Sequence, residues 1–343
     1  MHALQRKTLH RQFVTLAFCL VGLTSFVAAQ QLPLKIYTTA DGLAGKRISR
    51  IVRDSRGYLW FCTENGLSRF DGSRFTNYTA EQGLPDDEVN DLLETRGGAY
   101  WIATGNGLCL YNPKGLPLPN EQASLRSNTM FVVYHPGSNR MASDIKSLYE
   151  DRSGAVWVGT RRGLYRLEQA GGKVKFHFIE LGMPAGEPQT HVVRNILEDR
   201  QGALWLTTES GLYRRLSDGT VDRFTRNHGF TGERLMGLVE DRQGRLWVGD
   251  RFGGLCLLVS NPIANNPVVA RQYATKDGLG CVRVGSLYEA TDGRFWIGSD
   301  CGLAELLPNA DYARRRISVT LSGEELTDPR VWSLAEDSHG NLW

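Results

Sequence analysis

The hydrophobic pattern of the chain repeats at intervals of 41 to 56 residues, and a tryptophan marks each repeat. A glycine stands three residues before every marking tryptophan, and aliphatic residues stand nine and twelve residues before it. The first copy shows this as Ile48, Ile51, Gly57 and Trp60. The marking residues are Trp60, Trp101, Trp157, Trp205, Trp247, Trp296 and Trp343. Because glycine makes up only 38 of the 343 residues, this spacing is not accidental and indicates a repeat architecture.

Each repeat predicts a small antiparallel sheet. In the first copy an apolar run at 48–53 leads into Asp54-Ser55-Arg56-Gly57, where Asp and Gly suit a type I turn. Glu64-Asn65-Gly66 supplies a second tight turn, because Asn-Gly tolerates the positive φ of a hairpin. The other runs of the copy are residues 58–62, 67–70 and 74–78. Four such strands form one blade of a β-propeller, an all-β fold, and the frequent glycines disfavour a helical repeat.

Residues 145–164 read Ile-Lys-Ser-Leu-Tyr-Glu-Asp-Arg-Ser-Gly-Ala-Val-Trp-Val-Gly-Thr-Arg-Arg-Gly-Leu, a sequence that resembles the two-component regulator propeller repeat. A second phrase of that family, ending in Gly-Leu, appears between repeats as Asp41-Gly42-Leu43, Gln82-Gly83-Leu84 and Asp277-Gly278-Leu279. The resemblance covers nearly everything after Leu34. The departures from the pattern are local. Thr95 and Ala290 replace the turn aspartate, Asp250 and Ser299 replace the threonine, and Gly253 is an insertion.

This resemblance implies the extracytoplasmic sensor part of a bacterial hybrid histidine kinase or diguanylate cyclase. In such receptors the propeller precedes a small β-sandwich, a membrane helix and a cytoplasmic output module. The chain stops at Trp343, inside the seventh copy, so we expect an N-terminal fragment of a longer receptor that meets the membrane only through its missing C-terminal region. We expect the parent protein to have seven blades, with the seventh truncated here after six complete ones. Residues Leu34 to Thr38 resemble a fourth strand that would complete this last blade.

This fold is compatible with three functions, and by itself it specifies none of them. The resemblance favours a ligand-sensing domain that signals to a cytoplasmic module. The alternatives are a propeller scaffold for protein–protein interaction and a propeller lyase or glycosidase. The sequence shows no nucleophile elbow and no catalytic His–acid pair, so we expect enzyme activity only from a kinase or cyclase module outside this fragment. We expect no cofactor, and we expect the full receptor to be able to form a homodimer.

The composition changes this picture only at the N-terminus. The formal net charge of +3 comes from Arg6, Lys7 and Arg11, and the rest of the chain carries 37 basic and 37 acidic side chains. A neutral body gives no support to a nucleic-acid-binding surface. The basic residues precede an apolar run from Phe13 to Val27, which is too short for a typical membrane span. Residues 1–29 therefore predict a signal peptide, and residues 30–343 predict a periplasmic propeller whose parent is anchored in the inner membrane.

Two acidic columns run through the repeats. A glutamate stands seven residues before most of the tryptophans, and an aspartate often follows it. The glutamates are Glu94, Glu150, Glu198, Glu240, Glu289 and Glu336, with Arg53 at this position in the first copy. Rings of carboxylates could bind Ca²⁺ or supply paired acids. A feature that recurs in every blade is better explained as part of the scaffold, and the aspartates already cap turns.

Five cysteines remain after signal cleavage, with no Cys-x-x-Cys pair and no regular spacing. We therefore expect no metal site and mostly buried, small apolar cysteines. Cys281 and Cys301 are the exception, because they flank the hairpin formed by Val284 to Glu289 and Phe295 to Ser299. Both belong to the same end of one blade, and we predict a disulfide between them.

The blade-to-blade connectors and the second turn of every blade should share one face, which we call the connector face. Its residues differ between copies, and loops often carry function, although unselected surface would vary as well. Candidate residues around a binding entrance are Arg47, Asp87, Asp144, His191, Arg234 and Arg283. Residues ten before each tryptophan, such as Asp91, Ser147 and Asn195, should border a central channel with room for a ligand. This mixture of charges with scattered aromatics suits a small polar ligand, for example a glycan fragment.

Overall fold

The computed structural model describes residues 34–113, 130–170, 173–185, 191–260, 267–307, 317–322 and 328–343. The signal peptide predicted at residues 1–29 lies outside these ranges. Residues up to Tyr37 form one unit and Thr38–Trp343 form another, and the fold below is that of the second unit. Across the described ranges, no helix combines the length and the apolar character needed to cross a membrane.

The first six repeats each fold as a four-stranded antiparallel sheet whose strand order follows the chain, so the predicted all-β propeller is confirmed with six blades. Blades 1 to 3 contain β1 (Ile48–Arg53), β2 (Leu59–Thr63), β3 (Gly66–Phe70), β4 (Phe75–Tyr78), β5 (Val89–Glu94), β6 (Tyr100–Thr104), β7 (Gly107–Tyr111), β8 (Phe131–Tyr134), β9 (Ile145–Glu150), β10 (Val156–Thr160), β11 (Leu164–Ala170) and β12 (Lys173–Ile179). Blades 4 to 6 contain β13 (Val193–Glu198), β14 (Leu204–Thr208), β15 (Gly211–Arg215), β16 (Val221–Phe224), β17 (Leu235–Glu240), β18 (Leu246–Asp250), β19 (Gly254–Ser260), β20 (Pro267–Tyr273), β21 (Val284–Glu289), β22 (Phe295–Ser299), β23 (Gly302–Leu306) and β24 (Ile317–Ser322).

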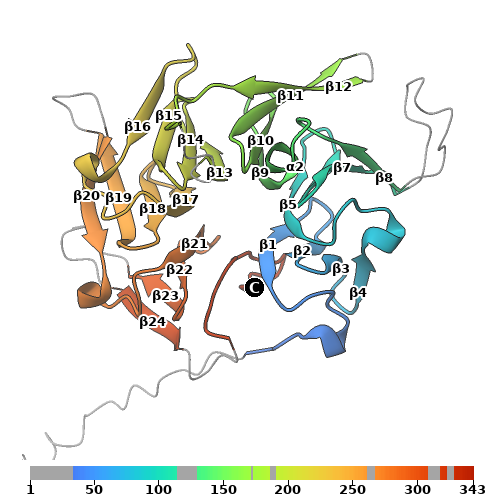
Figure 1. Cartoon of the computed structure of the whole chain (residues 1–343). Helices are drawn as coiled ribbons and strands as arrows, with labels where there is room; N and C mark the ends of the chain where they lie inside the picture. The colour runs from blue at the N-terminus through green and yellow to red at the C-terminus, as the bar shows by residue number, and fades with distance from the viewer. Residues whose placement is uncertain are drawn as a thin grey trace, which may run out of the picture. The chain divides into compact units, whose positions relative to one another are not determined.

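Within residues 38–343 the blades stand around a common axis, with the first strand of each blade innermost (Figure 1). Each of these inner strands contacts the inner strand of the following blade. The second strand of most blades is buried along its whole length, as in β2, β6 and β10. These strands are apolar on both faces because each is covered by a neighbouring blade on either side.

The repeated tryptophans are fixed by the aspartate six residues before them. The Oδ2 atom of Asp151 accepts a hydrogen bond from Trp157 Nε1 at 2.7 Å, and its Oδ1 atom accepts from the amide of Ala155 at 2.9 Å. The same indole bond recurs for Trp60, Trp205, Trp247 and Trp343. A buried indole N–H needs an acceptor, and a single carboxylate supplies it while also capping the first turn.

The glutamate column joins neighbouring blades. Glu150 Oε2 in blade 3 accepts a hydrogen bond from the Arg96 amide in the first turn of blade 2, at 2.8 Å. Equivalent bonds reach Glu94, Glu198, Glu240, Glu289 and Glu336 from the preceding turn. The structure therefore shows how the column serves the scaffold, which is the interpretation that the sequence favours.

The C-terminal segment 328–343 lies between blade 6 and blade 1 (Figure 1). Its first turn is formed, but its only pairing outside the named strands is an isolated bridge between Glu336 and Leu342. Trp343 packs against Phe61 and Phe70 of blade 1, with ring centroids 5.8 and 5.4 Å apart. Arg53, which replaces the column glutamate, donates from Nη1 to the carbonyl of Asp337 at 3.1 Å.

The strand expected at Leu34 to Thr38 is not formed. These residues have no regular secondary structure, and the side chains of Leu34 and Ile36 are 48% and 57% exposed. A strand needs a hydrogen-bonded neighbour, and segment 328–343 offers no third strand to pair with.

We expect Trp157→Ala to lower the free energy of unfolding by about 3–5 kcal/mol, since it empties a packed site and leaves Asp151 Oδ2 without its donor. Trp332→Ala is the matched control, because Trp332 stands outside the repeat register and is only half-buried. Urea denaturation of both variants measures the difference. Equal losses in the two variants would contradict the structural role assigned to the repeated tryptophan.

Stability should fall at low pH because of the aspartate column. Burial disfavours ionisation of Asp151, but bonds from Ser153, Trp157 and Ala155 outweigh it and lower the pKa of its carboxyl. For Asp337, bonds from Trp343 and Asn341 likewise outweigh burial and lower the pKa to about 2. A depressed folded-state pKa gives stability that is complete above the unfolded value of about 4 and is lost as pH falls toward about 2.

Asp151→Asn should therefore make the free energy of unfolding fall less steeply than in the wild type as the pH falls below about 4. Denaturation curves collected at several pH values test this. Burial raises the pKa of Asp91, which acts in the opposite direction in both proteins, so the comparison rests on the difference between variant and wild type. An unchanged slope in Asp151→Asn would show that this carboxylate does not contribute to acid sensitivity.

Candidate functional site

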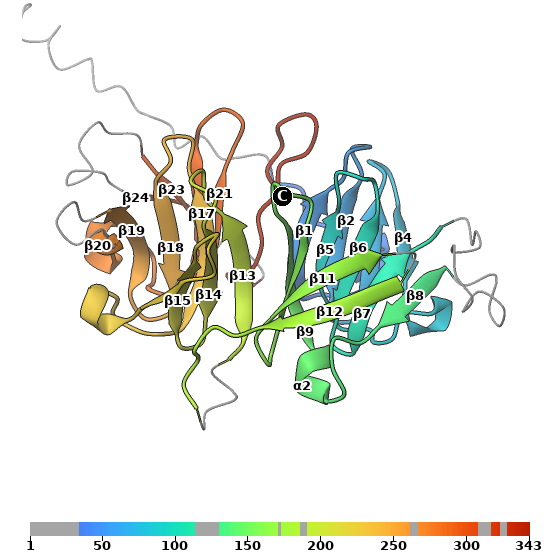
Figure 2. The same ribbon diagram turned by 90° about the horizontal axis from the view of Figure 1, so that it is seen from above.

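The connector face is built by the contact of each connector with the second turn of its own blade. The amide of Arg161, in the second turn of blade 3, donates to the carbonyl of Asp144 in the preceding connector at 3.0 Å. Blade 5 repeats this bond between Arg251 and Arg234 at 3.1 Å. The short helix α2 (Arg140–Ser143) belongs to the connector that leads into β9. Figure 2 shows it on the lower side of the ring, which is the connector face. The sequence thus predicts the composition of the face correctly from its turn pattern.

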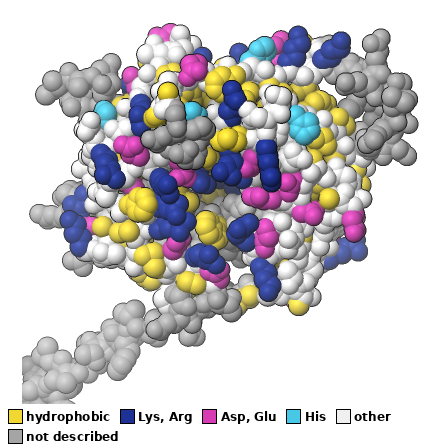
Figure 3. All heavy atoms as spheres, viewed as in Figure 1, with side chains coloured by type: hydrophobic (Ala, Val, Ile, Leu, Met, Phe, Trp, Pro, Cys, Tyr) yellow, Lys and Arg dark blue, Asp and Glu magenta, His cyan; other side chains and the backbone are white. Residues whose placement is uncertain are grey.

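The same face is turned toward the viewer in Figure 3. Its Lys and Arg side chains are interspersed with Asp and Glu side chains, and hydrophobic side chains lie among them. This distribution agrees with the mixed charge that the sequence indicates for the connectors and second turns.

The six predicted binding residues all lie in connectors or at their ends, and most contact neighbouring protein groups. The amide of Arg47 donates to Glu64 at 2.7 Å, and Asp87 Oδ1 accepts from the amide of Ala80 at 2.8 Å. His191 Nε2 bonds to the carbonyl of Pro184 at 2.9 Å. A role of these residues in ligand binding stays a prediction.

Three of the six form ion pairs. Asp144 lies 2.6 Å from Lys146 Nζ and 3.6 Å from Arg161 Nη1. Burial raises the pKa of its carboxyl despite the attraction of Lys146. Arg234 Nε lies 3.2 Å from Glu209, and Arg283 Nη1 donates to Asp300 at 2.9 Å. Asp144 and Arg283 are thus compensated within their own blades, whereas the pair of Arg234 with Glu209 joins blade 5 to blade 4.

Blades 4 to 6 bring several arginines close together. Arg194 and Arg234 share the carboxylate of Glu209, with Arg194 Nε 2.6 Å and Arg234 Nε 3.2 Å from its oxygens. Burial and the positive charge of Arg283, together with those of Arg234 and Arg194, lower the pKa of Arg251. This part of the face is therefore more favourable to a negative group than the blades around Asp144.

The central channel is not as open as the sequence predicts, because side chains of the inner strands extend into it. Residues ten before the tryptophan bond to the inner strand of the next blade, as Asp91 does with the amide of Leu148 at 2.9 Å. Arg50 of β1 lies 3.6 Å from Asp91 of β5 and donates to Asn195 of β13 at 3.4 Å. Its side chain thus spans the axis from blade 1 to blade 4 and takes up room that the sequence suggests for a ligand.

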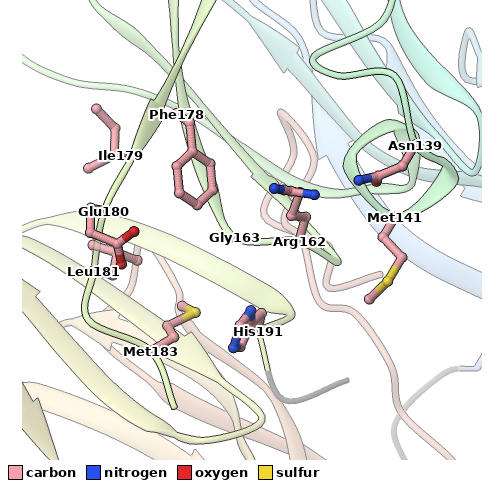
Figure 4. A pocket seen from close by; sticks show the side chains of 10 residues that line it. All are labelled: Asn139, Met141, Arg162, Gly163, Phe178, Ile179, Glu180, Leu181, Met183 and His191. Carbon is pink, nitrogen blue, oxygen red and sulfur yellow. The ribbon is translucent and has the colours of Figure 1, made fainter. Parts of the chain in front are cut away.

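A pocket of about 440 Å³ opens on the connector face at blade 3 (Figure 4). Three separate segments build it, namely the connector that contains α2, the second turn of blade 3, and the end of β12 with the residues after it. It is lined by Asn139, Met141, Arg162, Gly163, Phe178, Ile179, Glu180, Leu181, Met183 and His191. Of the six predicted residues, only His191 lines this pocket.

The polar groups of the pocket are held by their local structure. Asn139 caps α2, with its Oδ1 atom accepting from the amide of Ala142 at 2.8 Å. Glu180 Oε1 accepts from the amide of Gly182 at 2.9 Å, and the bond to Pro184 fixes the His191 ring. A mostly apolar pocket with a few oriented polar groups is the usual form of a small-molecule site.

The repeat pattern could not reveal most of this pocket. Phe178, Leu181 and Met183 belong to the fourth strand of blade 3 and its exit, where copies share little sequence. Arg162 belongs to the variable second turn, which the sequence does place on this face. The available signal was the aromatic pair Phe176 and Phe178, which lies two residues apart on an edge strand.

Metal binding has no support in the described ranges, since they contain no group of three or more His, Cys, Asp or Glu residues that could hold an ion.

Comparison with known proteins places these features in a family context. A family model described as two component regulator propeller matches residues 42–65, 140–162 and 186–210, and these matches span the first hairpins of blades 1, 3 and 4. No curated protein matches the chain significantly.

Solved structures share the fold. The extracellular domain of a protein described as a hybrid two component system from B. thetaiotaomicron is 22% identical, with a TM-score of 0.68 over 90% of this chain and 40% of that chain. A streptogramin B lyase is 15% identical, with a TM-score of 0.63 over 88% and 91%. Virginiamycin B lyase from Staphylococcus aureus is 14% identical, with a TM-score of 0.60 over 85% and 88%. The chain spans less than half of the first of these, and at such identities the likeness shows the propeller fold alone.

The structure joins Cys281 and Cys301 in a disulfide, with Cα atoms 5.8 Å apart. The bond ties the connector before β21 to the second turn of blade 6. Among the described cysteines, Cys62, Cys109 and Cys256 are free and buried, and burial raises the pKa of the Cys109 thiol to about 12. A buried, protonated thiol reacts slowly, so we expect these three cysteines to resist alkylation in the folded protein.

We expect peptide mapping of the protein purified without reductant to show Cys281 linked to Cys301, with the other three thiols alkylated only after unfolding. Replacing both cysteines by serine should lower the free energy of unfolding by about 2–4 kcal/mol, because the unfolded chain regains entropy. Alkylation of both residues in the native protein without reductant would show that the bond does not form.

Proposed function

We propose that this chain, which carries two-component regulator propeller repeats, is the ligand-sensing propeller of a bacterial extracytoplasmic receptor. The observation that carries the proposal is the family match itself, because it falls in register on the connectors and first hairpins of three blades. The fold shared with the extracellular domain of a hybrid two component system supports it. Ligand binding on the connector face would be passed to a cytoplasmic kinase or cyclase module in a longer protein.

The receptor that we propose has seven blades. Segment 328–343 supports this because it already makes the contacts of a blade on both sides. Glu336 accepts from the amide of Thr291 in blade 6 at 2.7 Å, and Ser333 Oγ accepts from the amide of Ile51 in blade 1 at 2.9 Å. Further strands added to this segment would complete the seventh blade, with Leu34 to Thr38 as its fourth strand.

We also propose that the propeller is exported. The support is the leader-like sequence at residues 1–29 and the disulfide between Cys281 and Cys301, which persists in an oxidising compartment. In this proposal the mature propeller is periplasmic and its parent is held in the inner membrane by a region outside this chain. The full receptor would also be able to form a homodimer, since two-fold dimers are the commonest symmetric assembly.

The ligand that we propose is a small polar molecule, with a glycan fragment as one candidate class. The connector face offers oriented charged and aromatic groups at blade 3, whereas the opposite face repeats the same Asp-x-x-Gly turn. A protein-interaction scaffold would use the same connector face. The lyase folds among the similar structures carry no argument for the same reaction here, because their identities are only 14% and 15%.

A thermal-shift screen with defined panels of disaccharides, amino acids and dicarboxylates tests the site of binding. We expect a stabilising compound to lose at least tenfold in affinity in one or more connector-face variants, namely Arg234→Gln, Asp144→Asn and Arg162→Gln, since removal of one polar partner typically costs about 1–3 kcal/mol. Arg294→Gln is the matched control, because Arg294 pairs with Asp292 at 2.6 Å in the turn on the opposite face. A compound whose affinity falls only in Arg294→Gln would place the site on the wrong side of the ring.

A further inference from the structure

The pocket at blade 3 has an apolar floor that remains open to solvent. The Phe178 side chain is 47% exposed, although it lines the same pocket as Met141, Leu181 and Met183. An exposed phenyl ring that borders a concave apolar surface gains free energy when a ligand covers it. The floor therefore selects a ligand with a flat or branched apolar part.

Opposite charges flank this floor. Arg162 lies on one side of Phe178 and Glu180 on the other (Figure 4), and the Arg162 guanidinium carbon is 5.9 Å from the Phe178 ring centroid. In the described part of the chain, no carboxylate forms an ion pair with Arg162. Its neighbour Arg161 is different, because it lies 3.6 Å from Asp144. The Arg162 cation is thus available to a ligand.

Glu180 supplies the complementary group. Its Oε1 atom accepts from the Gly182 amide, which orients the carboxylate, and among the described residues no cation forms an ion pair with it. A ligand that is only an anion would be attracted by Arg162 but repelled by Glu180, and a pure cation would meet the reverse. A neutral sugar would satisfy neither charge, so the electrostatic pattern favours a molecule that carries both.

The size of the pocket sets an upper limit on the ligand. Its volume of about 440 Å³ lies in the lower half of the usual range for small-molecule sites, about 300–1,000 Å³. One aromatic or large aliphatic amino acid, or a dipeptide, fits this volume, whereas a longer polymer would have to extend out of it.

We propose that this pocket binds a small zwitterion with an apolar side chain, of the amino acid type. Its carboxylate pairs with Arg162, its ammonium group with Glu180, and its side chain stacks on Phe178. This inference rests on the proposed sensing function and names the chemical class that the connector face at blade 3 would detect.

Isothermal titration calorimetry of the full chain with three probes tests the assignment. Phenylalanine carries both charges, 3-phenylpropionate lacks the ammonium group, and phenethylamine lacks the carboxylate. We expect phenylalanine to bind at least tenfold more tightly than either of the others, and a neutral disaccharide to bind more weakly still. Arg162→Gln should abolish the advantage of phenylalanine over phenethylamine, and Glu180→Gln its advantage over 3-phenylpropionate.

Arg161→Gln is the matched control, since Arg161 lies in the same turn but does not line the pocket, and it should leave phenylalanine binding unchanged. Phe178→Ala should weaken all three aromatic probes, and its unchanged melting temperature would show that the fold is intact. Phenylalanine binding no tighter than that of the disaccharide, or binding insensitive to Arg162→Gln and Glu180→Gln, would overturn the inference.

The outcomes also separate this inference from the sensing function. If a disaccharide or dicarboxylate bound and lost affinity in connector-face variants, the sensing proposal would stand and the zwitterion assignment would fall. If no connector-face substitution changed the affinity for any probe, both the sensing proposal and the zwitterion assignment would be wrong.

Discussion

The ring depends on an aspartate carboxylate in the first turn of blades 1, 3, 4 and 5 and of the seventh copy. Asp151 caps the turn with one oxygen and accepts the Trp157 indole with the other, so the conformation of the turn and the position of the largest core side chain are set together. Glu150, one residue earlier, accepts an amide from the preceding blade. Two adjacent acidic residues therefore connect local turn geometry, core packing and blade-to-blade order. A buried carboxylate without hydrogen-bond donors is unfavourable, so the turn, the indole and the carboxylate stabilise one another. A repeat without the aspartate must hold its turn and its tryptophan by other contacts.

The exceptions show how the chain compensates. Ala290 of blade 6 cannot accept the Trp296 indole, yet the turn keeps its backbone bonds from Ala290 to Arg294 and from Gly293 to Ala290, at 2.8 and 2.9 Å. The guanidinium carbon of Arg294 lies 5.1 Å from the Trp296 ring, a cation–π contact that arginines also make with the tryptophans of blades that keep the aspartate. At the seam, Arg53 replaces the glutamate and bonds to a carbonyl rather than to an amide. The polarity of the seam contact is thus reversed relative to the other blade junctions.

The sequence predicts the propeller well because its information is periodic. Each tryptophan, turn aspartate and column glutamate recurs at a fixed offset, so one physical explanation applies to many positions and errors at single sites do not accumulate. The pocket at blade 3 has no such redundancy. Phe178 and Met183 follow from the length and exit of one outer strand, and their neighbours Met141 and Arg162 come from other segments. The position of Arg50 across the axis is another single event. The other residues ten before a tryptophan are small, and the polar ones bond to neighbouring blades or to Arg50, as Ser147 does with Val193.

The two faces of the ring consequently have different mechanical roles. Near the Asp-x-x-Gly turns, column glutamates and arginine side chains cross every junction between complete blades, as Arg152 does to the carbonyl of Arg200 at 3.1 Å. On the connector face, many of the contacts of the second turns remain within a blade, such as Arg161 with Asp144 and Arg283 with Asp300. A perturbation at the connector of blade 3 or blade 6 would therefore first change contacts within that blade, whereas Arg234 and Glu209 link blade 5 to blade 4. Blade 3 is a suitable place for such a perturbation, because its pocket combines a connector, a second turn and the exit of an outer strand. Displacing any one of these segments changes the contacts of the other two.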